Sequence, residues 1–257
     1  MRIDGKVVLI TGASEGIGAA CAAEFAASGA RLALNSRNQD KLRASAPPGA
    51  FLAPGDVTSG TDRQAVIEST LARFGAIDIL INNAGAGYYQ PSWEMPLDEV
   101  RRLMDLNFFA PLALTQLAVP HMRARRTGMI VNIGSIAGKV PLPWMTLYSV
   151  SKSALGSLTE CQRMELKRDG IHTLLVCPGY VQTNFQKNVR HGQTPDRVRK
   201  AKRFAITAET CAQAIRRGVE RDARTIVTPR AGWLFVYAMR LFPSLCESKM
   251  AEMNGTA

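Results

Sequence analysis

The sequence predicts an α/β protein whose parallel sheet is covered by helices on both faces. Short runs of β-branched residues and leucine alternate with longer helical patterns along the 257 residues, and this alternation is typical of βαβ units. Several short runs are apolar almost throughout, as in strands that are buried on both faces. The first run leads into a glycine-rich turn and then an alanine-rich helix, the order expected of such a unit.

The same patterns place the individual elements. Strands are expected at residues 6–11, 31–35, 50–53, 77–82, 128–134, 171–177 and 225–228. Helices are expected at residues 16–28, 61–74, 97–126, 146–168 and 208–220. No repeat or low-complexity linker interrupts this order, so we expect a single domain over residues 1–257.

Composition excludes several classes of protein. The chain is 46% hydrophobic and 21% charged, as in ordinary globular proteins. Its five cysteines and three histidines form no cluster with metal-ligand spacing, so we expect no metal site. No signal peptide or membrane span is evident, and we expect a cytoplasmic protein. The net charge of +11 favours acidic partners, but without a reading motif we expect no nucleic-acid binding.

A glycine-rich turn follows the first expected strand. Its residues after Thr11 are Gly12, Ala13, Ser14, Glu15, Gly16, Ile17 and Gly18. Glycines let the backbone approach a pyrophosphate, which the free amides and positive dipole end of the next helix would stabilise. We therefore predict a dinucleotide site here. The spacing G-x-x-x-G-x-G differs from the common fingerprint, and a turn that serves packing alone is the alternative.

The end of the second strand indicates the form of the dinucleotide. An acidic residue at this point holds the ribose of NAD, whereas an arginine accommodates the 2′-phosphate of NADP. Here the strand ends in Asn35, Ser36 and Arg37, with a bidentate phosphate donor and no carboxylate. The sequence favours NADP(H), with NAD(H) as the second candidate. Alternatively, Arg37 only begins a solvated helix.

Three later motifs complete the set. They are Asn82-Asn83-Ala84-Gly85, then Ser135 followed by Tyr148-Ser149-Val150-Ser151-Lys152, and Pro178-Gly179 with Thr183. In this order and spacing, together with the glycine turn, they resemble the short-chain dehydrogenase/reductase family over nearly the whole chain. The resemblance implies a doubly wound Rossmann sheet of about seven parallel strands, in a homodimer or homotetramer.

The pair Tyr148 and Lys152 indicates the chemistry. Residues four apart share one face of a helix, so Lys152 can place an ammonium beside the phenol. The ordinary phenol pKa of about 10 is too high for proton exchange at neutral pH, and a neighbouring cation with oxidised nicotinamide would stabilise phenolate. Tyr148 is then the general acid/base. Taken alone, this spacing is also common on solvated helices.

The other catalytic candidates are Ser135 and Asn107. Ser135 lies at the carboxyl end of an expected strand, where its hydroxyl can bond the substrate oxygen. For Asn107 the resemblance implies a proton relay through a backbone-bound water, against the alternative of a helix-bending amide.

The resemblance also implies cofactor contacts at Tyr148 and Lys152, and at Asp56, Val57, Asn83, Ala84, Gly85, Pro178, Gly179, Val181 and Thr183. Cap and turn chemistry is their alternative explanation.

Two segments depart from the common pattern. Residues 184–207, the expected substrate lid, carry a basic run that is either a solvated face or an attractor for an anionic substrate or membrane. Residues 231–246 are apolar and suggest an added helix. We expect it to cover the substrate pocket or a subunit interface rather than to dock on a membrane.

The sequence therefore predicts an NADP(H)-dependent oxidoreductase that interconverts a carbonyl and a secondary or primary alcohol on a small to medium-sized, largely apolar substrate, in the reductive direction. Three alternatives remain, which are a non-catalytic NADP(H)-binding regulator, a ketoacyl-thioester reductase of lipid metabolism, and a sugar-nucleotide epimerase or dehydratase. The last class tends to have longer chains and a different glycine spacing.

Overall fold

A computed structural model describes residues 1–186 and 205–254 of the chain. Seven parallel strands form one sheet in the order β3-β2-β1-β4-β5-β6-β9, and β7 and β8 pair beside it. The strands are β1 Val7–Thr11, β2 Arg31–Asn35, β3 Phe51–Leu52, β4 Ile79–Asn82, β5 Gly128–Ile133, β6 Ile171–Pro178, β7 Val181–Gln182, β8 Ile206–Thr207 and β9 Thr225–Thr228. The predicted sheet of about seven parallel strands is confirmed.

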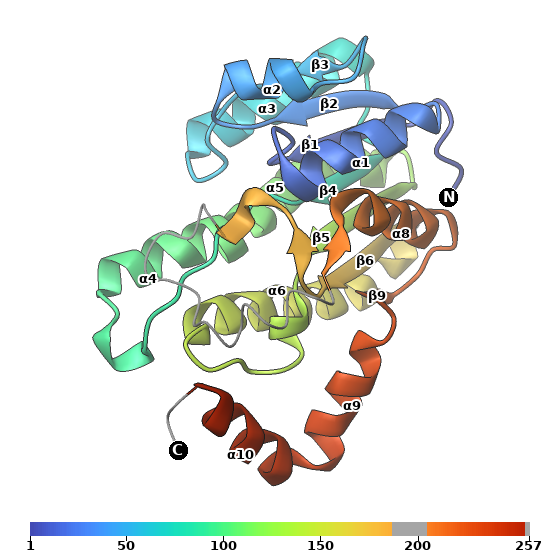
Figure 1. Cartoon of the computed structure of the whole chain (residues 1–257). Helices are drawn as coiled ribbons and strands as arrows, with labels where there is room; N and C mark the ends of the chain where they lie inside the picture. Colours follow the sequence, from blue (N-terminus) through green and yellow to red (C-terminus); the bar gives the residue numbers. More distant parts are fainter. Residues whose placement is uncertain (187–204, 255–257) are drawn as a thin grey trace.

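Helices cover both faces of the sheet (Figure 1). The α-helices of the described residues are α1 Gly16–Ala27, α2 Gln39–Ser45, α3 Gly60–Phe74, α4 Leu97–Met104, α5 Ala110–Ala124, α6 Thr146–Glu165, α8 Ala208–Glu220, α9 Gly232–Leu241 and α10 Pro243–Asn254, of which α9 and α10 extend away from the sheet (Figure 1). Successive residues of β1 point to opposite faces. Val8 and Ile10 pack in one core cluster with Phe25 of α1, and Leu9 packs in the other with Leu114 of α5. This arrangement confirms the doubly wound α/β class.

The order in which the chain adds strands to the sheet reverses between β1 and β4. From β1 the chain runs outward through β2 and β3 and then returns to place β4 on the other side of β1. At such a switch point the loops at the carboxyl ends of the strands separate, and they leave a crevice where ligands bind. The glycine turn follows β1 directly, so the fold places it at this crevice.

Some elements differ from the prediction. The helix expected at residues 97–126 is interrupted by a π-helical turn over Asp105–Phe109. By length and composition Leu97–Ala124 could cross a membrane, but 44% of its apolar window is buried inside the protein. Helix α2 was not predicted, because it is short and buries only Leu42, and α10 lacks an apolar period. Most of the expected substrate lid, residues 187–204, lies outside the residues that the structure describes. That residues 1–257 form one domain stays a prediction.

Candidate functional site

The glycine turn has a backbone that only glycine adopts easily. Gly12 and Gly16 have φ of +65° and +57°, in the left-handed region. A Cβ on Gly18 would lie 2.2 Å from the carbonyl oxygen of Gly12, so the turn and helix α1 touch directly. Glu15 is the N-cap of α1, and its side chain makes no capping hydrogen bond. The first amides of α1 therefore point out of the turn without a side-chain cap, as an anion site requires.

Asn83 braces this turn from the neighbouring strand. Its Nδ2 donates to the carbonyl oxygens of Thr11, at 2.9 Å, and Gly12, at 3.0 Å. The hydroxyl of Thr11 accepts hydrogen bonds from the backbone amides of Asn83 and Ala84, each at 3.1 Å. The Asn83 side chain thus holds the turn. Ala84 is in close contact with Gly12, because a Cβ added to Gly12 would come within 2.8 Å of the Ala84 Cα. Sequence reasoning missed the role of Thr11.

The candidates for reading the ribose lie together beyond β2 and β3. The Arg37 guanidinium is 3.8 Å from the Asp56 carboxylate, with exposed side-chain fractions of 66% and 36%. Ser36 is buried and donates its hydroxyl to the Asn38 carbonyl at 3.1 Å, and Val57 is buried. Arg37 precedes α2 and is not part of it. Its guanidinium is largely exposed and pairs with the Asp56 carboxylate at this edge of the sheet.

Tyr148 lies in a closed, largely apolar environment near Ser135. The Tyr148 side chain packs with Tyr89, Met145 and Phe185, and the Phe185 ring centroid is 5.7 Å away. Burial raises the pKa of Tyr148 to about 12, and a hydrogen bond with Ser135 lowers it in part. Ser135 follows β5, and its Oγ accepts from the Ala137 amide at 3.1 Å. The phenol is therefore protonated at neutral pH and in contact with a second hydroxyl.

Lys152 lies one helical turn after Tyr148, as the spacing predicted. Its Nζ is 5.9 Å from the Tyr148 ring centroid and donates to the Ile133 carbonyl at 2.9 Å. Burial lowers the pKa of Lys152 to about 8. The effects that set the Tyr148 pKa come first from burial, then from Ser135, Tyr89 and Cys177. The expected lowering of the Tyr148 pKa by Lys152 is not found among them, and burial has the largest effect.

Asn107 lies in the π-helical turn and is fully buried. Its Oδ1 accepts from the Ala86 amide, and its Nδ2 donates to the Ala86 carbonyl, both at 3.0 Å. The Nδ2 also donates to the Ser151 hydroxyl at 3.1 Å, which in turn donates to the Tyr148 carbonyl at 2.8 Å. Asn107 is therefore connected to the helix of Tyr148 through Ser151. Sequence reasoning passed over Ser151, although it is polar and adjoins Lys152.

Gly85 lies between these groups. A Cβ on Gly85 would be 3.1 Å from Asn107 Oδ1 and 3.3 Å from Lys152 Nζ. These contacts are closer than ordinary packing, so a side chain would displace the amide or the amine. Gly85 is thus required for the approach of Asn107 and Lys152, which supports its assignment to the site.

Further polar residues attach α6 to the sheet. Asn82 Nδ2 donates to Asn132 Oδ1 at 2.8 Å, and Asn132 Nδ2 donates to the Thr159 hydroxyl at 2.9 Å. All three residues are buried. The connection runs from β4 through β5 to α6, the helix that carries Tyr148 and Lys152. It fixes the position of these two side chains over the sheet edge.

The segment after β6 approaches the glycine turn from the other side. Pro178 ends β6, the Gly179 amide donates to the Thr228 carbonyl at 2.9 Å, and Val181 begins β7. A Cβ on Gly16 would lie 3.2 Å from Thr183 Cγ2, so Thr183 and the turn are neighbours. The Thr183 hydroxyl accepts from the Phe185 amide at 3.2 Å.

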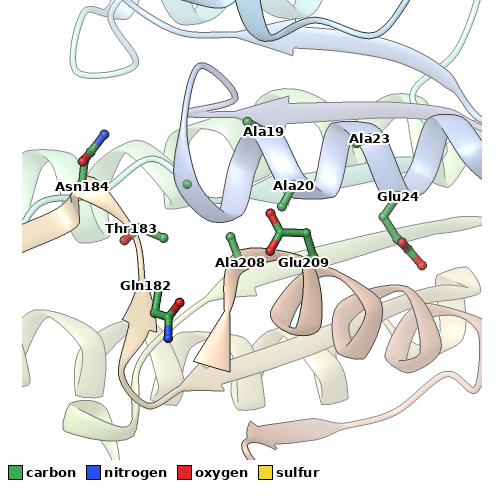
Figure 2. Close-up of a pocket in the computed structure, with 10 residues that line it drawn as sticks. Ala19, Ala20, Ala23, Glu24, Gln182, Thr183, Asn184, Ala208 and Glu209 are labelled. Carbon is green, nitrogen blue, oxygen red and sulfur yellow. The ribbon is translucent and has the colours of Figure 1, made fainter. Parts of the chain in front are cut away.

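A cleft of about 820 Å³ opens between α1, α8 and the segment after β7 (Figure 2). It is lined by Gly16, Ala19, Ala20, Ala23, Glu24, Gln182, Thr183, Asn184, Ala208 and Glu209. The cleft borders the glycine turn but does not include Tyr148. It therefore adjoins the expected phosphate end of a dinucleotide rather than the reacting end.

The predicted residues thus form three groups along the carboxyl edge of the sheet. Asn107, Ser135, Tyr148, Lys152 and Gly85 make the first, the glycine turn with Ala84, Asn83 and Thr183 the second, and Ser36, Arg37, Asp56 and Val57 the third. Within residues 1–186 and 205–254, no group of three His, Cys, Asp or Glu side chains could hold a metal ion. The arrangement fits an extended ligand with a reactive end near Tyr148.

Known proteins resemble this chain in sequence. The family profile described as short chain dehydrogenase matches residues 6–194. The 11-beta-hydroxysteroid dehydrogenase-like 3 protein of Arabidopsis thaliana is 37% identical over 244 residues, which cover 90% of this chain and 76% of that protein. The dehydrogenase/reductase SDR family protein 7-like of Anopheles gambiae is 31% identical over 275 residues, covering 99% and 86%.

Solved structures resemble this chain in fold. A short-chain dehydrogenase from Streptomyces avermitilis has a TM-score of 0.84 at 31% identity, covering 98% of this chain and 97% of the other. A short chain dehydrogenase/reductase from Burkholderia phymatum, solved in complex with NAD, has a TM-score of 0.85 at 26% identity, covering 95% and 96%.

Proposed function

Because this chain belongs to the short-chain dehydrogenase/reductase family, we propose that it transfers hydride between NADP(H) and the carbonyl or hydroxyl carbon of a largely apolar substrate. The observation that carries the proposal is the buried group of Ser135, Tyr148 and Lys152 at the carboxyl edge of the sheet. The Burkholderia phymatum relative was solved with NAD, which supports a nicotinamide cofactor here.

Tyr148 is the proton donor in this proposal. Its pKa of about 12 keeps the phenol protonated at neutral pH, which suits a general acid and hence the reductive direction. Ser135 donates a hydrogen bond to the carbonyl oxygen of the substrate and stabilises the negative charge that develops on it. When bound, reduced nicotinamide would supply the hydride to the carbonyl carbon. The substrate oxygen then takes the proton of Tyr148.

Lys152 and Asn107 support this proton transfer. The Lys152 pKa of about 8 leaves the amine mostly protonated at neutral pH, so a cation lies near the phenolate that Tyr148 becomes. Asn107 holds the Ala86 backbone and, through Ser151, the first turn of α6. We assign Lys152 to stabilising the phenolate and Asn107 to positioning the path by which the proton is replaced.

The surroundings of Tyr148 favour an apolar substrate. Tyr89, Met145, Leu142 and Phe185 pack around the phenol, and apolar walls with a few polar groups are typical of small-molecule sites. The Arabidopsis thaliana relative is named after a hydroxysteroid dehydrogenase, which supports a ring-sized apolar alcohol or ketone as the first class to assay.

A Tyr148→Phe variant tests the mechanism, because it removes the hydroxyl and keeps the ring. We expect NADPH-dependent reduction of ketones to fall by about 100-fold or more, while NADPH binding changes little. The control is Tyr237→Phe, which alters an exposed phenol on α9 and should leave the rate unchanged. Unchanged turnover in Tyr148→Phe would remove Tyr148 from the mechanism. Tight NADPH binding with no turnover of any alcohol or carbonyl by the wild type would favour the regulator.

An Arg37→Gln variant tests the preference for NADP(H). A charged hydrogen bond to the 2′-phosphate would be lost, so we expect the Kd of NADPH to rise about tenfold or more and that of NADH to change less than twofold. Arg43→Gln, at an exposed position in α2, is the control. Equal weakening of both dinucleotides by Arg37→Gln would contradict a role in phosphate recognition.

A further inference from the structure

The turn that leads into α6 has a tryptophan where glycine is usual. The Met145 amide donates to the Leu142 carbonyl at 3.2 Å, which closes a four-residue turn with Pro143 and Trp144 at its centre. Trp144 has φ of +64°. Proline followed by a left-handed residue is the pattern of a type II turn, whose second central position normally takes glycine. Because a bulky side chain on such a backbone costs free energy, the turn alone would favour glycine.

The other left-handed residues have a local explanation. Among the described residues other than glycine, Arg126 and Asp222 also have positive φ, of +49° and +50°. Arg126 follows the C-cap of α5, and Asp222 follows the C-cap of α8. A left-handed residue is common at this position because it ends the helix. Trp144 instead comes before α6, so helix termination does not explain its backbone.

Trp144 is joined to a second tryptophan through Gln90. The Trp144 carbonyl accepts from the Gln90 amide at 3.0 Å. The Gln90 Nε2 donates to the Glu94 carbonyl at 3.2 Å, in the short 3₁₀ helix Ser92–Glu94 that carries Trp93. The ring centroids of Trp93 and Trp144 are 6.2 Å apart, and their planes are inclined by 56°. Two loops therefore hold the indoles against each other at a fixed angle.

The indole pair lies at the rim of the pocket around Tyr148. Leu142 and Met145, at the two ends of the turn, pack in one cluster with Tyr148, whereas Trp93 and Trp144 lie outside that cluster. The exposed fraction of Trp93 is 78%, and Trp144 is half-buried. An apolar surface thus continues from Tyr148 through the turn to two indoles that solvent reaches.

This arrangement divides a ligand into two parts. The hydroxyls of Ser135 and Tyr148 would hold the carbonyl, and a small ketone would end among the residues that surround Tyr148. A longer ketone would extend past the turn and reach the indoles, whose faces and edges bind other rings favourably.

We propose that Trp144, held against Trp93, is a specificity-determining residue that binds the apolar part of the substrate remote from the carbonyl. The inference rests on the proposed function, since it requires an apolar carbonyl or alcohol substrate at Tyr148. It predicts that the site prefers ketones that carry a second ring beyond the reacting end.

Binding of two ketones with the same reacting end tests the proposal. Acetophenone and para-phenylacetophenone differ by one remote ring, and isothermal titration calorimetry with saturating oxidised NADP measures their Kd without turnover, because no hydride is available. We expect the wild type to bind para-phenylacetophenone at least tenfold more tightly. Trp144→Gly should weaken this binding at least tenfold and Trp93→Ala at least threefold, while the Kd of acetophenone changes less than twofold in both.

Two control variants match these changes outside the rim. Arg126→Gly releases a left-handed backbone at φ of +49°, and Phe242→Ala removes an aromatic ring with an exposed fraction of 62%. Both should bind the two ketones like the wild type. Trp144→Phe keeps a ring at the turn and should retain the affinity for para-phenylacetophenone within about threefold.

Three results would overturn the proposal. They are equal affinity of the wild type for both ketones, unchanged binding of para-phenylacetophenone by Trp144→Gly, and an equal loss for both ketones, which would assign Trp144 to the shape of the whole pocket. Glycine suits the turn, so Trp144→Gly should fold, and Trp93→Ala changes only an exposed ring. If the expected affinities are found but NADPH reduces neither ketone, the specificity assignment holds and the proposed reaction fails.

Discussion

At the scale of single residues, the burial of Lys152 makes the stability of the protein depend on pH. Its pKa is about 8 in the folded protein, against an ordinary value of 10.5, because burial disfavours the ammonium. Between these two values the unfolded chain binds more protons at this group than the folded chain. The stability of the protein therefore rises with pH across this window, and the rise that is due to Lys152 is complete above about pH 10.5.

Replacement of Lys152 by methionine should remove this dependence. Between pH 8 and pH 9.5, we expect the unfolding free energy of the wild type to rise by about 2 kcal/mol relative to that of Lys152→Met. Urea denaturation at both pH values measures the difference, in which other titrating groups cancel. Lys249→Met, an exposed lysine on α10, should show no such change. Parallel pH profiles for wild type and Lys152→Met would show that burial does not lower this pKa.

The individual residues of the site were predictable to different degrees. The spacing of Tyr148 and Lys152 placed them on one face of a helix, as the structure confirms. The direction of the Tyr148 pKa shift was not predictable, because it depends on burial by side chains such as Tyr89 and Phe185, which lie in other parts of the chain. Ser151 was missed for a similar reason, since its partner Asn107 is 44 residues away.

At the scale of elements, the contact between the glycine turn and α1 sets the shape of the predicted phosphate site. Gly18 has an ordinary helical backbone, so alanine would be favoured there by helix propensity alone. The Cβ of Gly18→Ala would nevertheless lie 2.2 Å from the Gly12 oxygen and 2.6 Å from Asn83 Nδ2. The turn and its brace must then move, and the first amides of α1 move with them.

We expect Gly18→Ala to destabilise the protein by about 1–3 kcal/mol and to weaken NADPH binding at least tenfold. Thermal unfolding and a fluorescence titration with NADPH measure the two effects. Gly60→Ala is the matched control at the start of α3, where the nearest atom would be Arg63 Nη2 at 3.7 Å. A Gly18→Ala protein with wild-type affinity would show that the close approach of turn and helix is not needed for binding.

Element bounds were predictable where local signals mark them. Helix α3 begins after Ser59, whose hydroxyl accepts from the Asp62 amide, and ends at Gly75 with φ of +77°. The π-helical turn at Asp105–Phe109 has no comparable signal. It is stabilised by the contacts of Asn107 with Ala86 and Ser151, which arise only when the elements pack together.

At the scale of the molecule, the alternation of strands and helices predicted a parallel sheet covered on both faces. The order of the strands did not follow from that pattern, because strands that are apolar on both faces carry no mark of their neighbours. Helices α9 and α10 show the same limit. Apolar composition at residues 231–246 indicated that the segment requires burial, but only the structure shows that Leu234 and Leu241 face outward.

The π-helical turn at Asp105–Phe109 makes the structure sensitive to the loss of a single residue from this part of the chain. A π-helical turn contains one residue more than the α-helical turn that it replaces. Deleting Leu106 or Phe108 would therefore convert Leu97–Ala124 into one regular helix and turn the Asn107 carboxamide away from Ala86. A deletion in a surface loop shortens only that loop, whereas here the loss of one residue would separate α6, the helix that carries Tyr148 and Lys152, from the Asn107 amide that contacts it through Ser151.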